Sequence, residues 1–431
     1  MNFIEFKIRL LLIILSVILL SNNISAEKSQ QPINDEEYIV FVNEEGGVPY
    51  RIPAIACTKD GDLVAVADYR YSKADIGVVK NGKIDLRYRI RDGKTGEWGE
   101  VMTLAAARGE GDENIAFGDP CIVADSESDL VLVTSCVGNI GFSKGTHENH
   151  MGWARFISED GGKTWSEYED IADQVFRVLD NRSDGNINTF FIGSGKILQS
   201  PTIKTGDFYR LYCAAVVKTG DNAIANYVFY SDDFGKNWKL LGTPDKPAIP
   251  SEADEPKVDE LPDGSILLSS RISGGRIYNI YHFTNVEKGE GEWSEPAISN
   301  TLNKGVVASE SACNGETLCI PVVRNSDGES VFLLLQSVPM HENRRRDVGI
   351  NYKELADIND YKEAEDIAKD WDGLYQVTDK SSAYSTMIMD KANKVAFLYE
   401  ENANNGGYDI VFKELPIEKI TKGAYTYRAD K

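Results

Sequence analysis

Short apolar runs, each bounded by polar turn residues, repeat along the chain from about residue 38 onward. They are rich in Val, Ile, Leu, Phe and Tyr, and representative runs span 63–67, 130–134, 265–269 and 331–335. Asp-Gly pairs at 60–61, 263–264 and 327–328 precede three of these runs. This pattern is typical of strands in an all-β protein. One segment differs, because 352–370 places Glu, Ala, Lys and Asp at helical spacing, which predicts a helical excursion in a loop.

An internal repeat narrows the choice among all-β folds. The pattern S-x-D-x-G-x-T/N-W occurs at 158–165 and again at 231–238, and degenerate copies lie at 92–98 and 284–293. The four tryptophans are 67, 73 and 55 residues apart, which fits one four-stranded blade with its loops. We therefore predict one six-bladed β-propeller domain of four-stranded antiparallel sheets over 38–431. The Ser and Asp of each repeat are expected to fix a turn and the Trp to pack between sheets, remote from any chemistry.

The first 26 residues have the composition of a targeting segment. Lys7 and Arg9 precede an apolar run at 10–20, and the polar residues that follow end at Ala26. This order is that of a secretory signal peptide. The apolar run is too short to span a bilayer, which takes roughly 20 residues. We expect export to the periplasm or beyond the cell, a short leader over 27–37, and no membrane span once the signal is cleaved.

Charge and residue types exclude several functions. The formal net charge is −22, which argues against a nucleic-acid partner and means that an anionic substrate needs a local cationic pocket. Only four histidines are present, and they are scattered, so a zinc site and a Ser-His-Asp triad both lack material. None of the six cysteines stands in a metal-binding motif, and no metal or organic cofactor is expected.

The cysteines also raise a question of pairing. Cys313 and Cys319 flank Asn314-Gly315, which is a hairpin turn signal, so a disulfide across a hairpin is compatible with an oxidising compartment. The sequence leaves the pairing open. The other four cysteines lie in apolar, strand-like contexts and are expected to be buried thiols.

The repeat resembles the Asp-box of sialidases, which several other propellers share, including non-catalytic sorting receptors. A sharper resemblance to bacterial-type exo-α-sialidases begins at Tyr50-Arg-Ile-Pro53, similar to the family's F/Y-R-I-P. On that match Arg51 is one of three arginines that clamp the substrate carboxylate. The alternative is a surface arginine before a proline turn. Arg70, in Ala67-Asp-Tyr-Arg70, looks like a further arginine that contacts the substrate.

Two aspartates compete for the acid/base position in the same region. Asp75 follows Arg70 at the place where the family has its acid/base aspartate on a mobile loop, whereas Asp68 directly continues an apolar strand. We favour Asp75 for that reason. Further along, the Asp-Pro pair at Asp119 resembles one whose aspartate hydrogen-bonds a substrate hydroxyl, although a turn-forming Asp-Pro is an equal alternative.

The central segment 254–271 resembles the family's N-E-x-x-V-x-E-L-x-D-G motif and the S-R that follows it. The match makes Glu255 the carboxylate paired with the nucleophile and Arg271 the second clamp arginine, whose alternative is a strand-end surface residue. Asp254 stands where the family has asparagine. Glu252 and Glu260 are rival carboxylates, and we expect both to be solvated.

The last motifs supply the third arginine and the nucleophile. Of the arginines at 344–346, the resemblance selects Arg345, and Arg344 and Arg346 remain alternatives. Ala383-Tyr-Ser385 resembles the family's G/A-Y-S, whose tyrosine is the nucleophile, so Tyr384 takes that role. The run 395–400 matches the strand that closes the motif. The matches occur in the family's order from Arg51 to Glu400.

The resemblance implies a retaining exo-α-sialidase that releases terminal sialic acid from sialylated glycans. The carboxylate on the anomeric carbon suits three guanidiniums, and a neutral tyrosine avoids setting one anion against another. Glu255 would take the tyrosine proton, with the arginines favouring the phenolate, and Asp75 would act as acid and then as base. The alternatives are a trans-sialidase, a hydrolase of the deaminated sugar, a sialic-acid-binding lectin with a dead site, and a structural Asp-box propeller.

Overall fold

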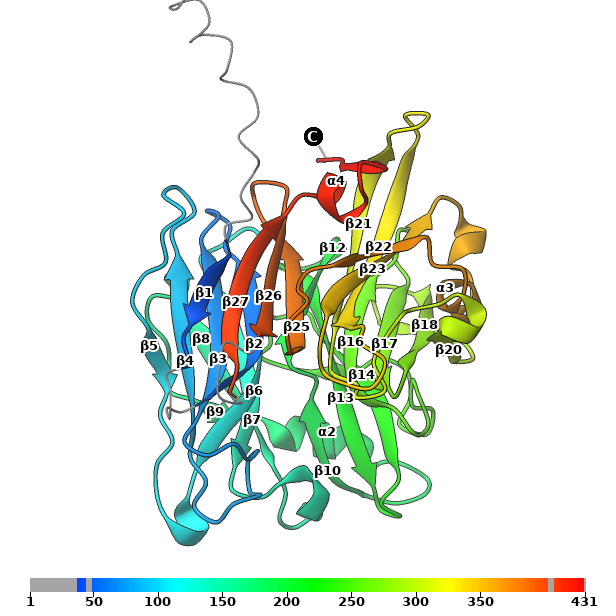
Figure 1. The fold of residues 1–431 in the computed structure, drawn as a ribbon. Helices are drawn as coiled ribbons and strands as arrows, with labels where there is room; N and C mark the ends of the chain where they lie inside the picture. The colour runs from blue at the N-terminus through cyan, green and yellow to red at the C-terminus, as the bar shows by residue number, and fades with distance from the viewer. Residues whose placement is uncertain (1–36, 44–48, 402–406, 430–431) are drawn as a thin grey trace, which may run out of the picture. The chain divides into compact units, whose positions relative to one another are not determined.

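Six β-sheets account for most of the chain from Tyr38 onward in the computed structural model, which describes residues 37–43, 49–401 and 407–429 (Figure 1). Each sheet is one blade, so the predicted six-bladed β-propeller is confirmed. The strand count per blade was too low, however, because four blades contain five strands. The predicted signal peptide and leader, at 1–26 and 27–37, lie outside the described residues except for Glu37.

The first three blades follow the chain order almost strictly. The first contains β2 (Tyr50–Cys57), β3 (Leu63–Arg70), β4 (Ile84–Arg91) and β5 (Met102–Ala105). The second contains β6 (Ala116–Ala124), β7 (Val131–Gly138), β8 (Gly152–Ser158), β9 (Glu169–Asp170) and β11 (Gly195–Lys196), of which β11 alone runs parallel to its neighbour. The third contains β10 (Ile187–Ile192), β12 (Leu198–Thr205), β13 (Phe208–Thr219), β14 (Ile224–Ser231) and β15 (Lys239–Leu240).

The last three blades bring the two ends of the described chain into the sheets. The fourth contains β16 (Asp254–Glu260), β17 (Ile266–Ile272), β18 (Gly275–Asn285), β19 (Glu290–Trp293) and β20 (Ala297–Asn300). The fifth contains β21 (Glu316–Arg324), β22 (Ser330–Pro339), β23 (Val348–Leu355), β24 (Gly373–Gln376) and β28 (Tyr425–Tyr427). The sixth contains β25 (Ser382–Met389), β26 (Val395–Glu401), β27 (Asp409–Leu415) and β1 (Tyr38–Phe41).

Pairing between β1 and β27 closes the ring. Tyr38 pairs with Phe412 and Ile39 with Val411, so the first described strand completes the blade that is otherwise built from the end of the chain. Figure 1 shows β1 in blue beside β27 in red.

The hydrophobic core is divided among the blades. Six clusters of buried side chains each join two neighbouring blades around the ring. Because a blade packs on both faces, its inner strands are apolar on both sides: Leu63 to Ala67 of β3 are all buried. This explains why the sequence shows continuous apolar runs instead of strict alternation.

The repeated S-x-D-x-G-x-T/N-W motif has the structural role expected of it. In one copy the Ser158 hydroxyl donates to Asp160, and that carboxylate accepts the backbone N–H of Thr164 at 2.9 Å. Trp165 then packs edge-on against Tyr88 of the preceding blade. The Trp238 ring of the second copy lies 5.3 Å from that of Trp153, again across a blade boundary.

One expectation from the sequence needs correction, and the open question of cysteine pairing is answered. The segment 352–370 is not helical from its start, because β23 extends to Leu355 through pairing with β22, and helix begins only with a 3₁₀ turn at Ile358–Asp360 and α3 (Ala364–Ala368). Cys313 and Cys319 are both free thiols. Asn314-Gly315 leads into β21 instead of forming a hairpin, and Cys319 lies within that strand, so the two cysteines do not face each other across a turn.

The helices of the described chain are short. Besides α3, they are α2 (Ala172–Leu179) and α4 (Ile417–Ile420). None of the helices within the described residues has the length and apolar character that a membrane span requires.

Candidate active site

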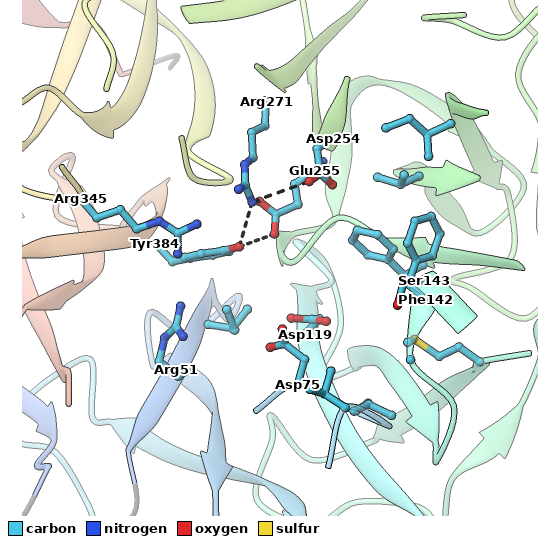
Figure 2. A pocket seen from close by; sticks show the side chains of 18 residues that line it. Arg51, Asp75, Asp119, Phe142, Ser143, Asp254, Glu255, Arg271, Arg345 and Tyr384 are labelled. Carbon is cyan, nitrogen blue, oxygen red and sulfur yellow. Dashed lines mark hydrogen bonds and ion pairs between the residues drawn. The ribbon is translucent and has the colours of Figure 1, made fainter. Parts of the chain in front are cut away.

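A pocket of about 430 Å³ gathers residues from motifs that are far apart in the sequence (Figure 2). Seven of the eight predicted site residues line it, namely Arg51, Asp75, Asp119, Glu255, Arg271, Arg345 and Tyr384. The eighth, Arg70, lies behind the pocket wall. The pocket is thus formed by residues that the sequence separates by more than 330 positions.

Backbone irregularities occur where four inner strands meet this pocket. The pairing register shifts beside Arg51 in β2, around Asp119 in β6, at Glu255 in β16 and at Tyr384 in β25. Ile52 and Asp119 also have φ angles of 53° and 54°, which is rare for residues other than glycine. Bulges of this kind re-aim side chains, and here all four turn a functional group toward one pocket.

Tyr384, Glu255 and Arg271 form the centre of the site. The Tyr384 hydroxyl donates a short hydrogen bond to one oxygen of the Glu255 carboxylate. Arg271 Nη1 donates to the other carboxylate oxygen at 2.7 Å and to the Tyr384 hydroxyl at 3.2 Å. The tyrosine therefore has a proton acceptor already in contact, which is the arrangement of an activated nucleophile.

Burial strongly affects the ionisation of this tyrosine. The Tyr384 side chain is only 6% exposed, and burial together with the nearby Glu255 carboxylate raises its pKa well above 10, against the opposing influence of Arg271. Arg271 favours the phenolate, as expected, but burial has the larger influence on the pKa of Tyr384. The raised pKa means that the Tyr384 phenol keeps its proton at neutral pH.

Arg51 is held by a glutamate, Glu400, that was not among the predicted site residues. Glu400, at the end of β26, is fully buried and accepts from Arg51 Nε at 2.6 Å. The same carboxylate accepts the backbone N–H groups of Ile52, at 2.9 Å, and of Tyr384, at 3.2 Å. Glu400 thus fixes both a clamp arginine and the backbone of the tyrosine.

The three consecutive arginines, at 344–346, differ in their surroundings. Arg345 lines the pocket, its Nη2 donates to the Ala312 carbonyl at 3.1 Å, and its guanidinium carbon lies 5.6 Å from the Tyr384 ring centre. Arg346 is exposed and pairs with Asp347 outside the pocket, and Arg344 is exposed as well. Arg51 lies 5.4 Å from the same ring, so three guanidiniums surround Tyr384.

Asp75 and Asp119 stand on the side of the pocket opposite Arg271, and Arg70 joins them from behind. Arg70 is 2% exposed, donates to Asp75 and binds the buried Asp68 at 2.7 Å. Arg70 does not line the pocket, and its guanidinium faces three carboxylates, those of Asp68, Asp75 and Asp119. Direct contact of Arg70 with a substrate stays a prediction. Asp68, the rival of Asp75, does not line the pocket.

The three carboxylates around Arg70 influence one another. Burial, and then the neighbouring Asp68, raises the pKa of Asp119 to about 8. Burial likewise raises the pKa of Asp68 to about 6, although Arg70 opposes this. The Asp119 carboxyl, whose side chain is 29% exposed, therefore keeps its proton to a higher pH than an ordinary aspartate does.

The other rival carboxylates lie away from the centre. Glu252 is exposed and outside the pocket wall, as expected. Glu260 is not solvated as expected: it is buried at the other end of β16, where the Thr202 hydroxyl donates to it. Asp254 lines the pocket beside Arg271, with 3.8 Å between the charged atoms.

The remaining wall of the pocket is apolar, and no sequence motif pointed to it. It comes from the first three blades and includes Ile76, Phe142, Met151, Phe191 and Val216. Figure 2 shows Phe142 on the side opposite Arg345 and Arg51. Within the described residues, no group of three or more His, Cys, Asp or Glu side chains has the arrangement of a metal site.

The sequence is similar to one protein family and to several bacterial sialidases. Residues 79–396 match the family described as "BNR repeat-like domain". A sialidase of Micromonospora viridifaciens is 29% identical over 256 residues, covering 58% of this chain and 36% of that protein. A sialidase of Paraclostridium sordellii is 25% identical over 236 residues, covering 52% of this chain and 53% of that protein. The chain thus spans between about a third and a half of these relatives.

Solved structures show the same architecture. A Hadza microbial sialidase superposes with a TM-score of 0.65 at 20% identity, covering 89% of this chain and 69% of that one. The intramolecular trans-sialidase from Ruminococcus gnavus, in complex with oseltamivir carboxylate, gives 0.67 at 16% identity, covering 90% and 99%. Fold and repeat together define an Asp-box propeller of six blades. The chain belongs to the BNR repeat-like family, and the curated relatives that it matches are bacterial sialidases.

Proposed function

We propose that the protein is a retaining exo-sialidase that removes terminal sialic acid from glycans. The observation that carries the proposal is the set of three guanidiniums, from Arg51, Arg271 and Arg345, around a tyrosine that donates to a carboxylate. Sialic acid has its carboxylate on the anomeric carbon, so a substrate held by this clamp presents that carbon to Tyr384. The sialidase relatives support the same assignment.

The chemistry takes two steps. In the first, the Tyr384 oxygen bonds to the anomeric carbon while Glu255 accepts its proton, and Asp75 protonates the leaving glycosidic oxygen. In the second, Asp75 takes a proton from water, the resulting hydroxide displaces Tyr384, and Glu255 returns the proton to the tyrosine. Two displacements at one carbon retain its configuration. A neutral nucleophile suits this substrate, because a carboxylate nucleophile would meet the substrate's own anion.

Three measurements on one reaction test the proposal. The protein is incubated with 3′-sialyllactose, and proton NMR identifies the anomer of sialic acid that is released first. A fluorinated sialyl donor is then used to accumulate the covalent intermediate, and mass spectrometry locates the label. We expect the α-anomer and a label on the peptide containing Tyr384. A β-anomer, or a label on Glu255, would contradict the mechanism.

The same reaction separates the alternatives. Binding of sialyllactose without release at any pH between about 4 and 8 would favour a lectin. Transfer of the sialyl group to added lactose, or formation of an internal anhydro sugar, would favour a trans-sialidase. The apolar wall at Phe142, Phe191 and Val216 supports a preference for the N-acetylated sugar over the deaminated one, because an acetamido methyl group gains from apolar contact.

We also propose that the protein acts outside the cytoplasm. Residues 1–26 have the order of a signal peptide, and glycans bearing sialic acid are surface or secreted molecules. N-terminal sequencing of protein recovered from the periplasm or the medium is expected to begin near Glu27. An intact N-terminus on protein confined to the cytoplasm would contradict export.

A further inference from the structure

The loop between β3 and β4 carries Asp75, and little within the loop itself fixes that side chain. Asp75 is 73% exposed and has an ion pair with Arg70. Its carbonyl accepts the backbone N–H of Val78 at 3.3 Å, and Ile76 beside it is a buried anchor. A proton donor on such a loop needs support from elsewhere, because proton transfer requires heavy atoms within about 3 Å of each other.

That support is a backbone contact with a loop of the next blade. Gly77 has φ +69°, and a Cβ placed on it would lie 2.2 Å from the Gly141 nitrogen and 2.6 Å from the Asn139 oxygen. A Cβ on Gly141 would in turn lie 2.9 Å from the Ile76 oxygen. The two loops therefore touch through their backbones, at a separation that only glycine allows.

The partner loop, 139–151, is fastened to the third blade. Lys218 of β13 donates to the Ser143 carbonyl at 3.1 Å, and His147 Nε2 lies 3.0 Å from the Asp180 carboxylate after α2. Gly145 packs so closely on Thr189 of β10 that a Cβ there would lie 2.7 Å from the threonine Cβ. The loop that touches Gly77 is thus a fixed surface attached to a neighbouring blade.

We propose that Gly77 and Gly141 are positioning residues for the acid/base step. The contact between them sets how far the Asp75 carboxylate reaches into the pocket, so blade-to-blade packing determines the geometry of proton transfer. This inference rests on the proposed function, in which Asp75 protonates the leaving oxygen. Any side chain at Gly77 pushes the two loops apart and withdraws Asp75. Arg271, Arg345 and Tyr384 lie on other blades and stay in place. Arg51 belongs to the first blade as well, but it stands on β2, where Glu400 of the sixth blade holds it.

Leaving-group dependence tests the proposal. Gly77→Ala is compared with the unmodified protein on two donors of the same sialyl group, 3′-sialyllactose and a 4-nitrophenyl sialoside. The nitrophenolate departs without protonation, whereas the sugar alkoxide needs it. We expect kcat/KM to fall about 10²-fold on sialyllactose and by less than about tenfold on the aryl donor, since general acid catalysis contributes roughly 10²–10⁴-fold. Asp75→Asn should show the same profile, and combining the two changes should add little.

Gly206→Ala is the matched control. Gly206 has φ +65°, close to that of Gly77, but a Cβ there meets nothing within 4 Å, so this variant carries the backbone strain without the clash. It lies in the turn between β12 and β13, and its kinetics should match those of the unmodified protein on both donors. Thermal unfolding of Gly77→Ala and Gly206→Ala shows whether strain alone lowers stability.

Each outcome decides the matter. If Gly77→Ala does not fold, Gly141→Ala takes its place, because Gly141 has φ −74° and suffers only the loop contact. An equal loss on both donors, or no loss, in the variant that folds would overturn the positioning role. If the unmodified protein releases sialic acid from neither donor, the proposed function itself is contradicted. This result differs from an unchanged or uniform loss in the glycine variant, which contradicts only the positioning role of the contact between Gly77 and Gly141.

Discussion

The two halves of the pocket differ in composition and in what the sequence shows of them. One half carries Tyr384, Glu255 and the three guanidiniums, and every one of these groups stands in a short motif. The other half is a wall of apolar side chains from the first three blades, with no motif of its own. The reacting half needs particular atoms at particular positions, whereas the wall needs only apolar volume, which many sequences supply.

The halves should also act at different stages of the reaction. Groups that move protons or form bonds stabilise the transition state and affect kcat, whereas a wall that contacts an unchanging part of the sugar binds ground and transition states alike. The following predictions test this division, beginning with the change of largest expected effect.

Tyr384→Phe should reduce kcat by at least about 10³-fold, because the variant lacks the oxygen that bonds to the anomeric carbon. Binding of an unreactive sialic acid analogue, measured by calorimetry, should stay within about threefold, since the clamp remains intact. Tyr408→Phe is the control, because the Tyr408 ring packs on Arg51 at 5.3 Å but does not line the pocket, and the kcat of this variant should change little. Full activity of Tyr384→Phe would contradict the assignment of bond formation to the half of the pocket that carries Tyr384.

Arg345→Lys should lower kcat/KM by about 10- to 100-fold, because a point charge replaces a planar donor pair and a charged hydrogen bond contributes about 1.5–3 kcal/mol. The neighbours provide two matched controls. Arg344→Lys and Arg346→Lys change exposed side chains outside the pocket and should leave kcat/KM within about twofold. A larger loss in either neighbour would move the third clamp position away from Arg345.

Phe142→Ala tests the apolar half. It should raise KM for the N-acetylated sugar by about tenfold and leave kcat nearly unchanged, because one apolar contact contributes roughly 1–3 kcal/mol to binding. The same variant should treat the deaminated sugar like the unmodified protein, and that donor serves as the internal control. A fall in kcat with both sugars would show that this wall also takes part in positioning the reacting groups.

The smallest expected effect is a change in KM with pH, which we assign to ionisation of Asp119. Its pKa is raised from 3.8 to about 8, so the carboxyl is neutral below about pH 8 and gains a negative charge as pH rises through that value. KM for the anionic substrate should then rise about fivefold, since repulsion between partly solvated charges costs roughly 1 kcal/mol. Asp119→Asn should lack this rise between pH 7 and 9. A KM that rises equally in both proteins would assign it to another group.

The sequence predicts more of the reacting half than of the scaffold around it. Arg51, Glu255 and Tyr384 are found from motifs because each sits at a strand end with its bulge, where few residue types are tolerated. The choice of Arg345 over Arg344 and Arg346 depends on which way a loop turns, and local sequence does not encode that direction. Glu400 was missed because its partners are 349 and 16 residues away, and a lone glutamate at a strand end has no signal of its own.

Other differences between the predicted and the observed structure also arise from contacts between residues far apart in the sequence. The count of six blades follows from the spacing of the tryptophans, but the fifth strands, such as β28 and the two-residue β11, are added by long-range pairing that the repeat does not show. The turn signal at Asn314-Gly315 does not give a hairpin, because turn propensity is local and the residues there continue into β21. Glu260 is buried because a neighbouring blade covers its strand end.

Ring closure by β1 has a consequence for how the protein is made. β1 (Tyr38–Phe41) pairs with β27 (Asp409–Leu415), so the sixth blade cannot be completed until all five preceding blades have been translated. That blade also supplies Tyr384 and Glu400, and Glu400 binds Arg51 from the first blade. Pairing across so long a stretch of chain is slow to form. We therefore expect the proposed activity to appear only after the ring has closed, so that its recovery during refolding would report the final assembly step.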